Sequence, residues 1–427
     1  MQLSLIVLLI VFFGLMILSV PIAYCIGLGG MAALMIGGTL PVQIFAQKTL
    51  GAVDSFTVLA VPFFIISGEI MLKGGIARRL IALADILVGR HAKGGMAYVT
   101  MVASALFGAI SGSAVATTTA IGGMMYPEMV RKNYSQPFAA AIGAVGGTLG
   151  ILIPPSIAAI IYGTSTNTSV GDMFLVCGVV GVVACVFYCV AAKVEIHWED
   201  IQLPDKKTIS LREVLQVFWD ALLGLLAPII ILGGIYGGIF TATEAAVVAI
   251  VYSFLVCKFI YRELSMKQFR EALVTAAITT GMVELLLGVA TFFSYILSIE
   301  RVGAMIKAAV SSGGITKTTF LIISIVILVI LGMLMETIPI IVLTAPILVP
   351  IASDFGIDSL QFGALVVFTL SYGLFTPPFG MDVFVATTYS KQPVMAVFAK
   401  CRWFFVFGIV LVFIIAFFPD FYMWIAR

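Results

Sequence analysis

Charged side chains are scarce in this sequence. Of its 427 residues, 23 are basic and 21 are acidic, so that 10% are charged, whereas a typical soluble domain has about 25%. A soluble globule of this length would expose roughly 16,000 Å² of surface, which so few charges cannot keep in water. Apolar residues make up 62% of the chain, and they form runs too long for the strands of a membrane barrel. The sequence therefore predicts an all-α polytopic membrane protein.

The sequence also lacks the side chains that build zinc sites, disulfide frameworks and nucleotide sites. Its two histidines, His91 and His197, lie in charged connecting segments, which excludes a histidine base inside the membrane. The six cysteines form no Cys-x-x-Cys pair, and we interpret them as small residues within apolar runs. No GxxxxGK[ST] string is present, and a net charge of +2 gives no reason to expect a nucleic-acid partner.

Apolar runs separated by short polar breaks predict ten membrane spans. In the first half these are 3–20, 22–40, 56–72, 137–164 and 171–192, and in the second half 218–240, 241–261, 272–298, 360–389 and 394–417. The N-terminus lacks the basic stretch of a signal peptide, so the first run is predicted to be a retained span. Each half also contains an amphipathic stretch, at 75–90 and 300–312, and a long segment rich in small residues or interrupted by proline, at 95–127 and 318–353.

One constant difference in residue number, which we call the repeat offset, relates landmarks in the two halves. It pairs Tyr126-Pro127 with Val349-Pro350, Pro154-Pro155 with Pro377-Pro378, and Gly150 with Gly373. This agreement indicates an internal repeat. We predict a first repeat at 1–192, a cytoplasmic linker at 193–217 and a second repeat at 218–427.

The distribution of basic residues predicts the topology. If 95–127 and 318–353 are re-entrant hairpins, each half has five spans, and an odd number inverts the second half relative to the first. With the N-terminus outside, 18 of the 23 Lys and Arg residues then lie on the cytoplasmic side, as the positive-inside rule requires. If either long segment were an ordinary span, all later segments would change sides, and the excess of Lys and Arg on the cytoplasmic side would be lost.

Four segments predict interruptions of helix at membrane depth: 108–113, 146–156, 335–339 and 373–380. Consecutive prolines in the second and fourth remove amide donors, so both spans must unwind. Unwinding frees carbonyl oxygens, and the adjacent Ser and Thr hydroxyls add neutral oxygens that suit Na⁺. The positive ends of the half-helices suit an anionic substrate group. The alternative is that these small residues only let helices pack closely.

Carboxylates within apolar segments are candidates for function. Glu336 lies at the predicted tip of the second hairpin, and Asp382 lies just beyond the second Pro-Pro pair; both could face a cavity or pair with a buried donor. Thr241 stands three residues before Glu244, which predicts a helix-capping box. Asp54 and Glu69 are expected at the membrane interface, and no role is assigned to Glu284.

Several strings give the sequence a family resemblance. They stand at 62–71, 74–76, 111–113, 150–156, 233–241, 345–348 and 376–378, and include Gly150-Ile151-Leu152-Ile153-Pro154-Pro155-Ser156. In this order and spacing, the chain resembles the large membrane (M, DctM-like) subunit of tripartite ATP-independent periplasmic (TRAP) transporters, a family that includes sialic acid transporters. The match is nearly full length.

The resemblance implies an elevator-type importer in the bacterial inner membrane that is coupled to Na⁺, with a fold like that of the ion-transporter superfamily. It implies two partners, a separate small membrane subunit and a soluble periplasmic binding protein that delivers organic carboxylates such as sialic acid or C4-dicarboxylates. Some dicarboxylate-type members carry His where Thr376 stands and Asn near Asp382. This chain departs from that pattern at both positions, which favours a sugar acid over a dicarboxylate as the substrate.

By the same resemblance, two or more Na⁺ ions are expected at the hairpin tips. The first site would use Ser111, Ser113, Gly150, Ile153 and Pro155, and the second Thr337, Gly373, Thr376 and Pro378. Substrate contacts are expected from Ser113, Thr117, Ser156, Glu336, Thr337 and Asp382.

Two alternatives remain. A stand-alone Na⁺:anion symporter of similar architecture would need no binding protein. Alternatively, Ser111-Gly112-Ser113 could suggest an intramembrane serine hydrolase, but both histidines lie far from this stretch in the sequence. We therefore expect a transporter and no enzyme.

Overall fold

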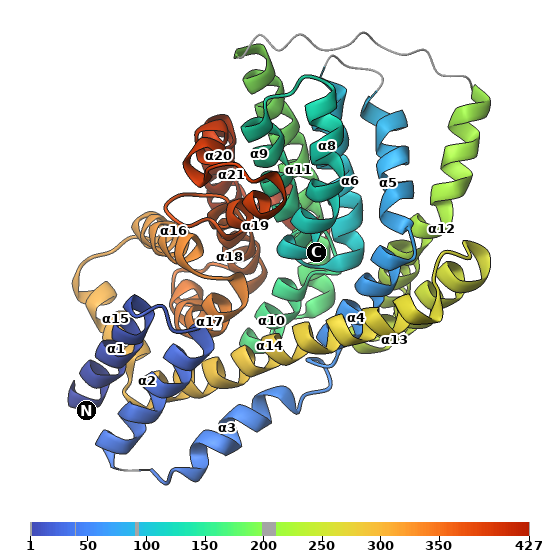
Figure 1. Cartoon of the computed structure of the whole chain (residues 1–427). Coiled ribbons are helices and arrows are strands. Elements are labelled where there is room, and N and C mark those ends of the chain that lie inside the picture. Colours follow the sequence, from blue (N-terminus) through green and yellow to red (C-terminus); the bar gives the residue numbers. More distant parts are fainter. Residues whose placement is uncertain (1, 39, 90–93, 199–210, 427) are drawn as a thin grey trace.

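A computed structural model of the chain describes residues 2–38, 40–89, 94–198 and 211–426 (Figure 1). All regular structure in these residues is helical, which confirms the predicted all-α class. The first half contains α1 (Gln2–Ile17), α2 (Ile22–Gly37), α3 (Gln43–Val53), α4 (Ala60–Lys73), α5 (Ile76–Ala84), η1 (Asp85–Gly89), α6 (Gly95–Ser111), α7 (Ala114–Thr117), η2 (Thr118–Gly122), α8 (Gly123–Arg131), α9 (Gln136–Thr148), η3 (Leu149–Ile151), α10 (Ile157–Thr166) and α11 (Val170–Trp198). The second half contains α12 (Leu211–Tyr236), α13 (Ala242–Leu255), η4 (Val256–Ile260), α14 (Met266–Ile299), α15 (Val302–Ser312), α16 (Lys317–Leu334), α17 (Thr337–Asp354), α18 (Ser359–Gly373), α19 (Met381–Ser390), α20 (Val394–Lys400), α21 (Arg402–Phe417) and α22 (Asp420–Met423).

The helices form two groups, which we call the scaffold (α1–α5 and α12–α15) and the inner bundle (α6–α11 and α16–α21). In the scaffold, α14 packs against α2, α3 and α4, and α13 packs against α4. Figure 1 shows α14 running along one side of the molecule, beneath the inner bundle. The two groups meet where α14 contacts α17 and where α4 contacts α6.

Six of the described helices are long and apolar enough to cross a membrane, or up to eight if each of two bent pairs is one span. Two of the six, α16 and α17, occupy the segment 318–353 that was predicted to be a re-entrant hairpin. Ten spans were predicted elsewhere, and fewer of them qualify because several are short helices or are divided by a break. Within the predicted span 394–417, α20 and α21 meet at a bend of 59°. At this bend Arg402 donates two hydrogen bonds to the buried carboxylate of Glu195 on α11, at 2.9 and 3.0 Å. This polar anchor explains why the segment is not one straight helix.

Two further elements differ from the predictions. Helix α3 lies in a segment for which no helix was predicted, because it contains Gln43, Gln47 and Lys48 and lacks a long apolar run. Helices α11 and α12 also occupy both ends of the predicted linker 193–217. The centre of that linker lies outside the described residues.

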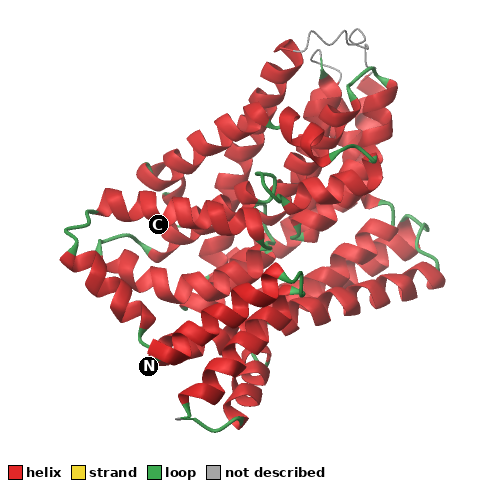
Figure 2. Ribbon diagram, turned by 60° about the vertical axis from the view of Figure 1, so that its left-hand side comes forward, coloured by secondary structure: helices red, strands yellow, loops and turns green. Residues whose placement is uncertain are grey.

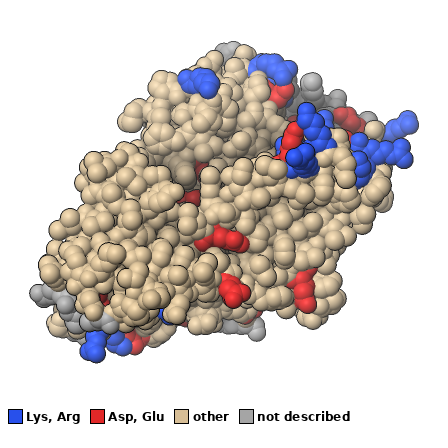
Figure 3. Space-filling view, turned by 60° about the horizontal axis from the view of Figure 1, so that its bottom comes forward, with Lys and Arg blue, Asp and Glu red and all other residues tan. Residues whose placement is uncertain are grey.

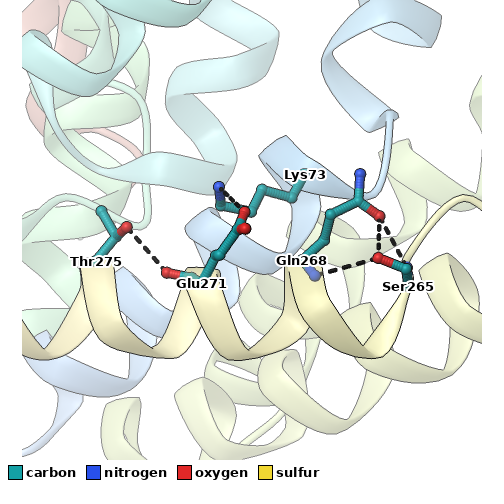
Figure 4. A network of polar contacts seen from close by, with 5 residues as sticks. All are labelled: Lys73, Ser265, Gln268, Glu271 and Thr275. Atoms are coloured by element: carbon teal, nitrogen blue, oxygen red, sulfur yellow. Dashed lines mark hydrogen bonds and ion pairs between the residues drawn. The ribbon is translucent and has the colours of Figure 1, made fainter.

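Polar contacts fix the start of α14 to α4 and α5. Ser265 and Gln268 form a capping box at the first turn of α14, and Lys73 at the end of α4 lies 3.5 Å from Glu271 (Figure 4). Arg79 of α5 hydrogen-bonds Glu263 at 2.7 Å. Burial would raise the pKa of Glu263, but its hydrogen bonds and ion pairs with Arg79 and Arg78 lower the pKa below its usual value. The predicted capping box of Thr241 and Glu244 is also present, at the start of α13.

The repeat offset reappears in the element bounds. It relates the end of α6 to the end of α16, and it relates the stretch 114–131, which holds α7, η2 and α8, to the single helix α17. Ser371 donates a hydrogen bond of 3.0 Å to the carbonyl oxygen of Thr148, and the same offset relates these two residues. The correspondence supports the predicted repeat, whose division and inversion remain predictions. Figure 2 shows that several loops lie among the helices in the middle of the molecule.

Candidate substrate and ion site

The tips of the two predicted hairpins line one cavity of about 430 Å³. The first tip is the turn between α6 and α7, and the second is the turn between α16 and α17. Across the cavity lie residues of α4 and α14, including Glu69 and Thr279. The cavity therefore lies between the inner bundle and the scaffold.

The first tip is tied together by its own hydroxyls. The Oγ atom of Ser111 and the Oγ1 atom of Thr117 lie 3.0 Å apart, and Thr117 donates to the carbonyl oxygen of Ser113 at 2.8 Å. Gly112 has φ +62°, a left-handed conformation that lets the chain turn sharply between the two helices. Ser113 caps α7 by accepting from the amide of Ala116. These contacts hold three oxygen-bearing side chains in one short turn.

This tip docks onto the first broken span. The amide of Ile157 donates to the carbonyl oxygen of Gly112 at 3.4 Å. A Cβ atom placed on Gly150 would lie 2.4 Å from Oγ1 of Thr117 and 2.5 Å from the carbonyl oxygen of Ser113. Only a glycine leaves room for the hydroxyl and carbonyl oxygens to lie this close to the broken helix. Pro155 contributes another carbonyl oxygen, which lies 2.7 Å from a Cβ placed on Gly112.

The second tip meets the second broken span in the same way. The amide of Gly380 donates to the carbonyl oxygen of Met333 at 3.3 Å. Gly332 and Gly373 approach so closely that a Cβ on Gly373 would lie 2.6 Å from the carbonyl carbon of Gly332. The hydroxyl of Thr376 donates to the carbonyl oxygen of Tyr372 at 2.6 Å.

The second tip and the adjoining helix α19 carry polar groups without partners. Thr337 is 4% exposed, and its hydroxyl makes no hydrogen bond with the described residues. Asp382 is fully buried, and neither of its carboxylate oxygens has a hydrogen-bond partner there. Thr118 and Glu336 neighbour this carboxylate. A buried carboxyl group without a hydrogen-bond partner is unfavourable, and no described residue satisfies this one.

The structure distributes the predicted site residues over three places. Ser111, Ser113, Glu336 and Thr337 line the cavity. Thr117, Ser156 and Asp382 are fully buried behind its wall. Gly150, Pro155, Gly373 and Thr376 lie in the broken spans, where Ile153 is half-buried and Pro378 is exposed.

One contributor was missed by sequence reasoning: Glu69 was expected at the membrane interface, but it lines the cavity from α4. Thr117, which was expected at the substrate, contributes its hydroxyl to the oxygen cluster at Gly150. The signal for Thr117 was its position one turn after the tip, since a hydroxyl at that spacing can bond back to the turn.

The oxygen cluster at Gly150 fits a small monovalent cation. It combines the hydroxyls of Ser111 and Thr117 with the carbonyl oxygen of Ser113, and all three are neutral. Neutral oxygens suit Na⁺ better than Ca²⁺, which usually requires carboxylate ligands. Within the described residues, no group of three His, Cys, Asp or Glu side chains could hold a metal ion. Any ion here would thus be held by the tips and breaks.

The fold of the chain is shared with solved structures of membrane transporters. The chain is similar in structure to the YdaH transporter of Alcanivorax borkumensis, with a TM-score of 0.61 and 13% identity over 89% of each chain. It is also similar to MtrF of Neisseria gonorrhoeae, with a TM-score of 0.61 and 14% identity over 90% of this chain and 85% of that one. At such identities the likeness concerns the fold alone.

Sequence comparison narrows this class to one family. Residues 9–421 match the model of the tripartite ATP-independent periplasmic transporter, DctM component. The chain belongs to this family and is a large permease subunit, not an enzyme.

Relatives within the family have different substrates in their names. The chain is 39% identical to the isethionate TRAP transporter permease protein DctMQ of Oleidesulfovibrio alaskensis, over 87% of this chain and 58% of that longer protein. It is 39% identical to the C4-dicarboxylate TRAP transporter large permease protein DctM of Pseudomonas aeruginosa, over 87% of this chain and 86% of that one. It is 33% identical to the sialic acid TRAP transporter large permease protein SiaM of Vibrio cholerae, over 89% of this chain and 88% of that one.

Proposed function

We propose that the chain imports an organic acid across the bacterial inner membrane together with Na⁺. The observation that carries the proposal is the cluster of neutral oxygens at Gly150, which directly adjoins the cavity. An ion bound there would lie beside the substrate and would offset part of its negative charge. Substrate and Na⁺ would then favour each other's binding, which is the thermodynamic basis of symport.

The wider arrangement of the transporter follows from the same proposal. A periplasmic binding protein delivers the substrate, and a small membrane subunit supports the scaffold. The N-terminus lies on the periplasmic side. The inner bundle carries the tips across the membrane while the scaffold stays in place, as in an elevator mechanism. Support comes from the cavity, which lies between the moving group and α4 with α14.

Transport into proteoliposomes tests the proposal. Vesicles holding this chain and its small subunit are supplied with a binding protein and labelled sugar acids, C4-dicarboxylates and sulfonates. An inward Na⁺ gradient is expected to drive accumulation, and choline in place of Na⁺ is expected to abolish it. Equal uptake in choline would contradict Na⁺ coupling.

A stand-alone Na⁺:anion symporter is the second candidate. The two solved structures of similar fold have titles that describe transporters and do not mention a tripartite system. Omitting the binding protein separates the two. Uptake that persists at the same rate without it would favour the stand-alone mechanism.

A further inference from the structure

The cavity at the hairpin tips has an unexpected charge for the site of a simple anion. Its described lining includes the carboxylates of Glu69 and Glu336 and no Lys, Arg or His. On the face shown in Figure 3, Lys and Arg side chains lie along the margins, whereas acidic side chains also lie in the middle. A dianionic substrate would therefore meet two carboxyl groups and no basic side chain to bind it.

Neither Glu69 nor Glu336 forms a hydrogen bond or ion pair with the described residues. Lys73, one turn after Glu69, interacts with it electrostatically and forms its ion pair with Glu271. Glu336 stands at the N-cap of α17, but its side chain accepts no capping hydrogen bond. Its carboxylate is therefore not occupied in holding the helix.

A second observation also indicates a ligand at this end. Thr337 lines the cavity, is 4% exposed and has an unpaired hydroxyl. Asp382, a neighbour of Glu336 with both oxygens unpaired, is fully buried and does not itself line the cavity. A positively charged hydrogen-bond donor in the cavity would give the second tip the partner that the chain does not supply.

The first tip has the opposite character. Its groups at the cavity are the hydroxyl oxygens of Ser111 and Ser113, next to the proposed Na⁺ position at Gly150. A negatively charged group of the substrate is favoured here, beside the cation. The cavity therefore has one end suited to an anion and one end suited to a cation.

We propose that the transported acid also carries a protonated amine, which binds at Glu336 with Glu69 facing it, while its acid group lies toward the first tip. The substrate class is a zwitterion, such as an amino acid or an aminosulfonate. This inference rests on the proposed function and specifies the substrate of the same site.

Matched ligand pairs test the inference without a transport assay. Taurine and isethionate differ only in an ammonium and a hydroxyl group, as do L-aspartate and L-malate. Thermal stabilisation of the purified full-length chain is measured with each compound at fixed Na⁺. We expect at least one amine to stabilise the chain at a concentration about thirtyfold or more below that of its hydroxy partner, as for a desolvated charge pair.

Two variants locate the effect. Glu336→Gln is expected to remove the preference for the amine, so that the two members of a pair stabilise the variant at similar concentrations. Glu128→Gln is the matched control, because Glu128 lies on the surface and pairs with Arg131 of its own helix. It should retain the wild-type preference.

The outcomes separate this inference from the proposed function. If only the hydroxy acids stabilise the chain, or if no amine in the set does, the inference that the substrate is a zwitterion is overturned. An amine preference that survives Glu336→Gln overturns it too. If Glu336 instead only holds a second Na⁺, the variant weakens Na⁺ stabilisation without ligand and equally for both members of a pair, which also overturns it. Na⁺-driven uptake of any acid in the proteoliposome experiment sustains the proposed function in each of these cases.

Discussion

The two hairpin tips share a backbone arrangement and differ in chemistry. The repeat offset relates Ser113 to Glu336, and each is the N-cap of the second helix of its hairpin. At the first tip the polar groups bond to one another, whereas at the second Thr337 and Asp382 remain unpaired. The difference indicates a division of labour. Under the proposed function, the first tip is organised before an ion binds, and the second depends on a ligand to complete it.

The scaffold shows another difference between the halves. In the first half α3 and α4 are separate helices, whereas α14 continues for 34 residues without a break. The repeat offset relates the start of α3 to the start of α14, whose end lies beyond the counterpart of α4. A continuous helix across the scaffold would give the rigid wall that the proposed elevator mechanism requires.

The largest expected effect tests the shared backbone arrangement. In Gly373→Ala the new Cβ would lie 2.6 to 3.0 Å from backbone atoms of Gly332, which cannot rotate away. We expect a loss of about 3 kcal/mol in the free energy of unfolding, measured by chemical denaturation in detergent. Gly281→Ala is the control, since nothing lies within 4 Å of its Cβ. A stable Gly373→Ala variant would contradict the close contact.

The next prediction contrasts the two tips directly. Thr117→Val removes the hydrogen bonds to Ser111 and Ser113, so unfolding should become easier by about 2 kcal/mol without ligand. Thr337→Val removes only an unpaired hydroxyl, so the same measurement should change little. Ligand-induced stabilisation should instead weaken in Thr337→Val. Equal destabilisation by both substitutions would remove the proposed distinction between the tips.

A smaller effect of opposite sign is expected at Asp382. Replacing an unpaired buried carboxylate with the neutral amide of Asn should stabilise the ligand-free chain by about 1 kcal/mol. Substrate uptake should fall at the same time, because the charge that favours a cationic group nearby is lost. Thermal unfolding and uptake are measured on the same preparation. A destabilised Asp382→Asn chain would show that the carboxylate has a partner of its own.

The smallest effect concerns the far ends of the hairpins. Asp354 ends α17 and lies 2.7 Å from Lys307 of α15, whereas Arg131, its counterpart in the first half, pairs with Glu128 in its own helix. Both ion pairs are exposed. Lys307→Ala should therefore change stability by about 0.5 kcal/mol or less. Raising the salt concentration should reduce even this difference, and a large salt-independent loss would contradict it.

The sequence predicted the breaks well because glycine and consecutive prolines act locally. Gly112, Gly150 and Gly373 lie at the turns or close contacts where small residues were expected to matter. The cavity wall was less predictable. Glu69 lies in an apolar run whose pattern does not show which side of the helix faces the protein interior. Only the packing of α4 against the inner bundle places it at the cavity. The bend between α20 and α21 was missed for a similar reason, since its anchor Glu195 is distant in the sequence.

The hydrogen bond between Ser371 and Thr148 joins the two broken spans at equivalent points. Both residues are fully buried, so the two broken spans are joined at this point and do not form a hinge there. In the proposed mechanism, an inner bundle joined in this way carries both tips together. Cargo and ions are then expected to be loaded before the bundle moves, and transport of only one of them would require this hydrogen bond to break.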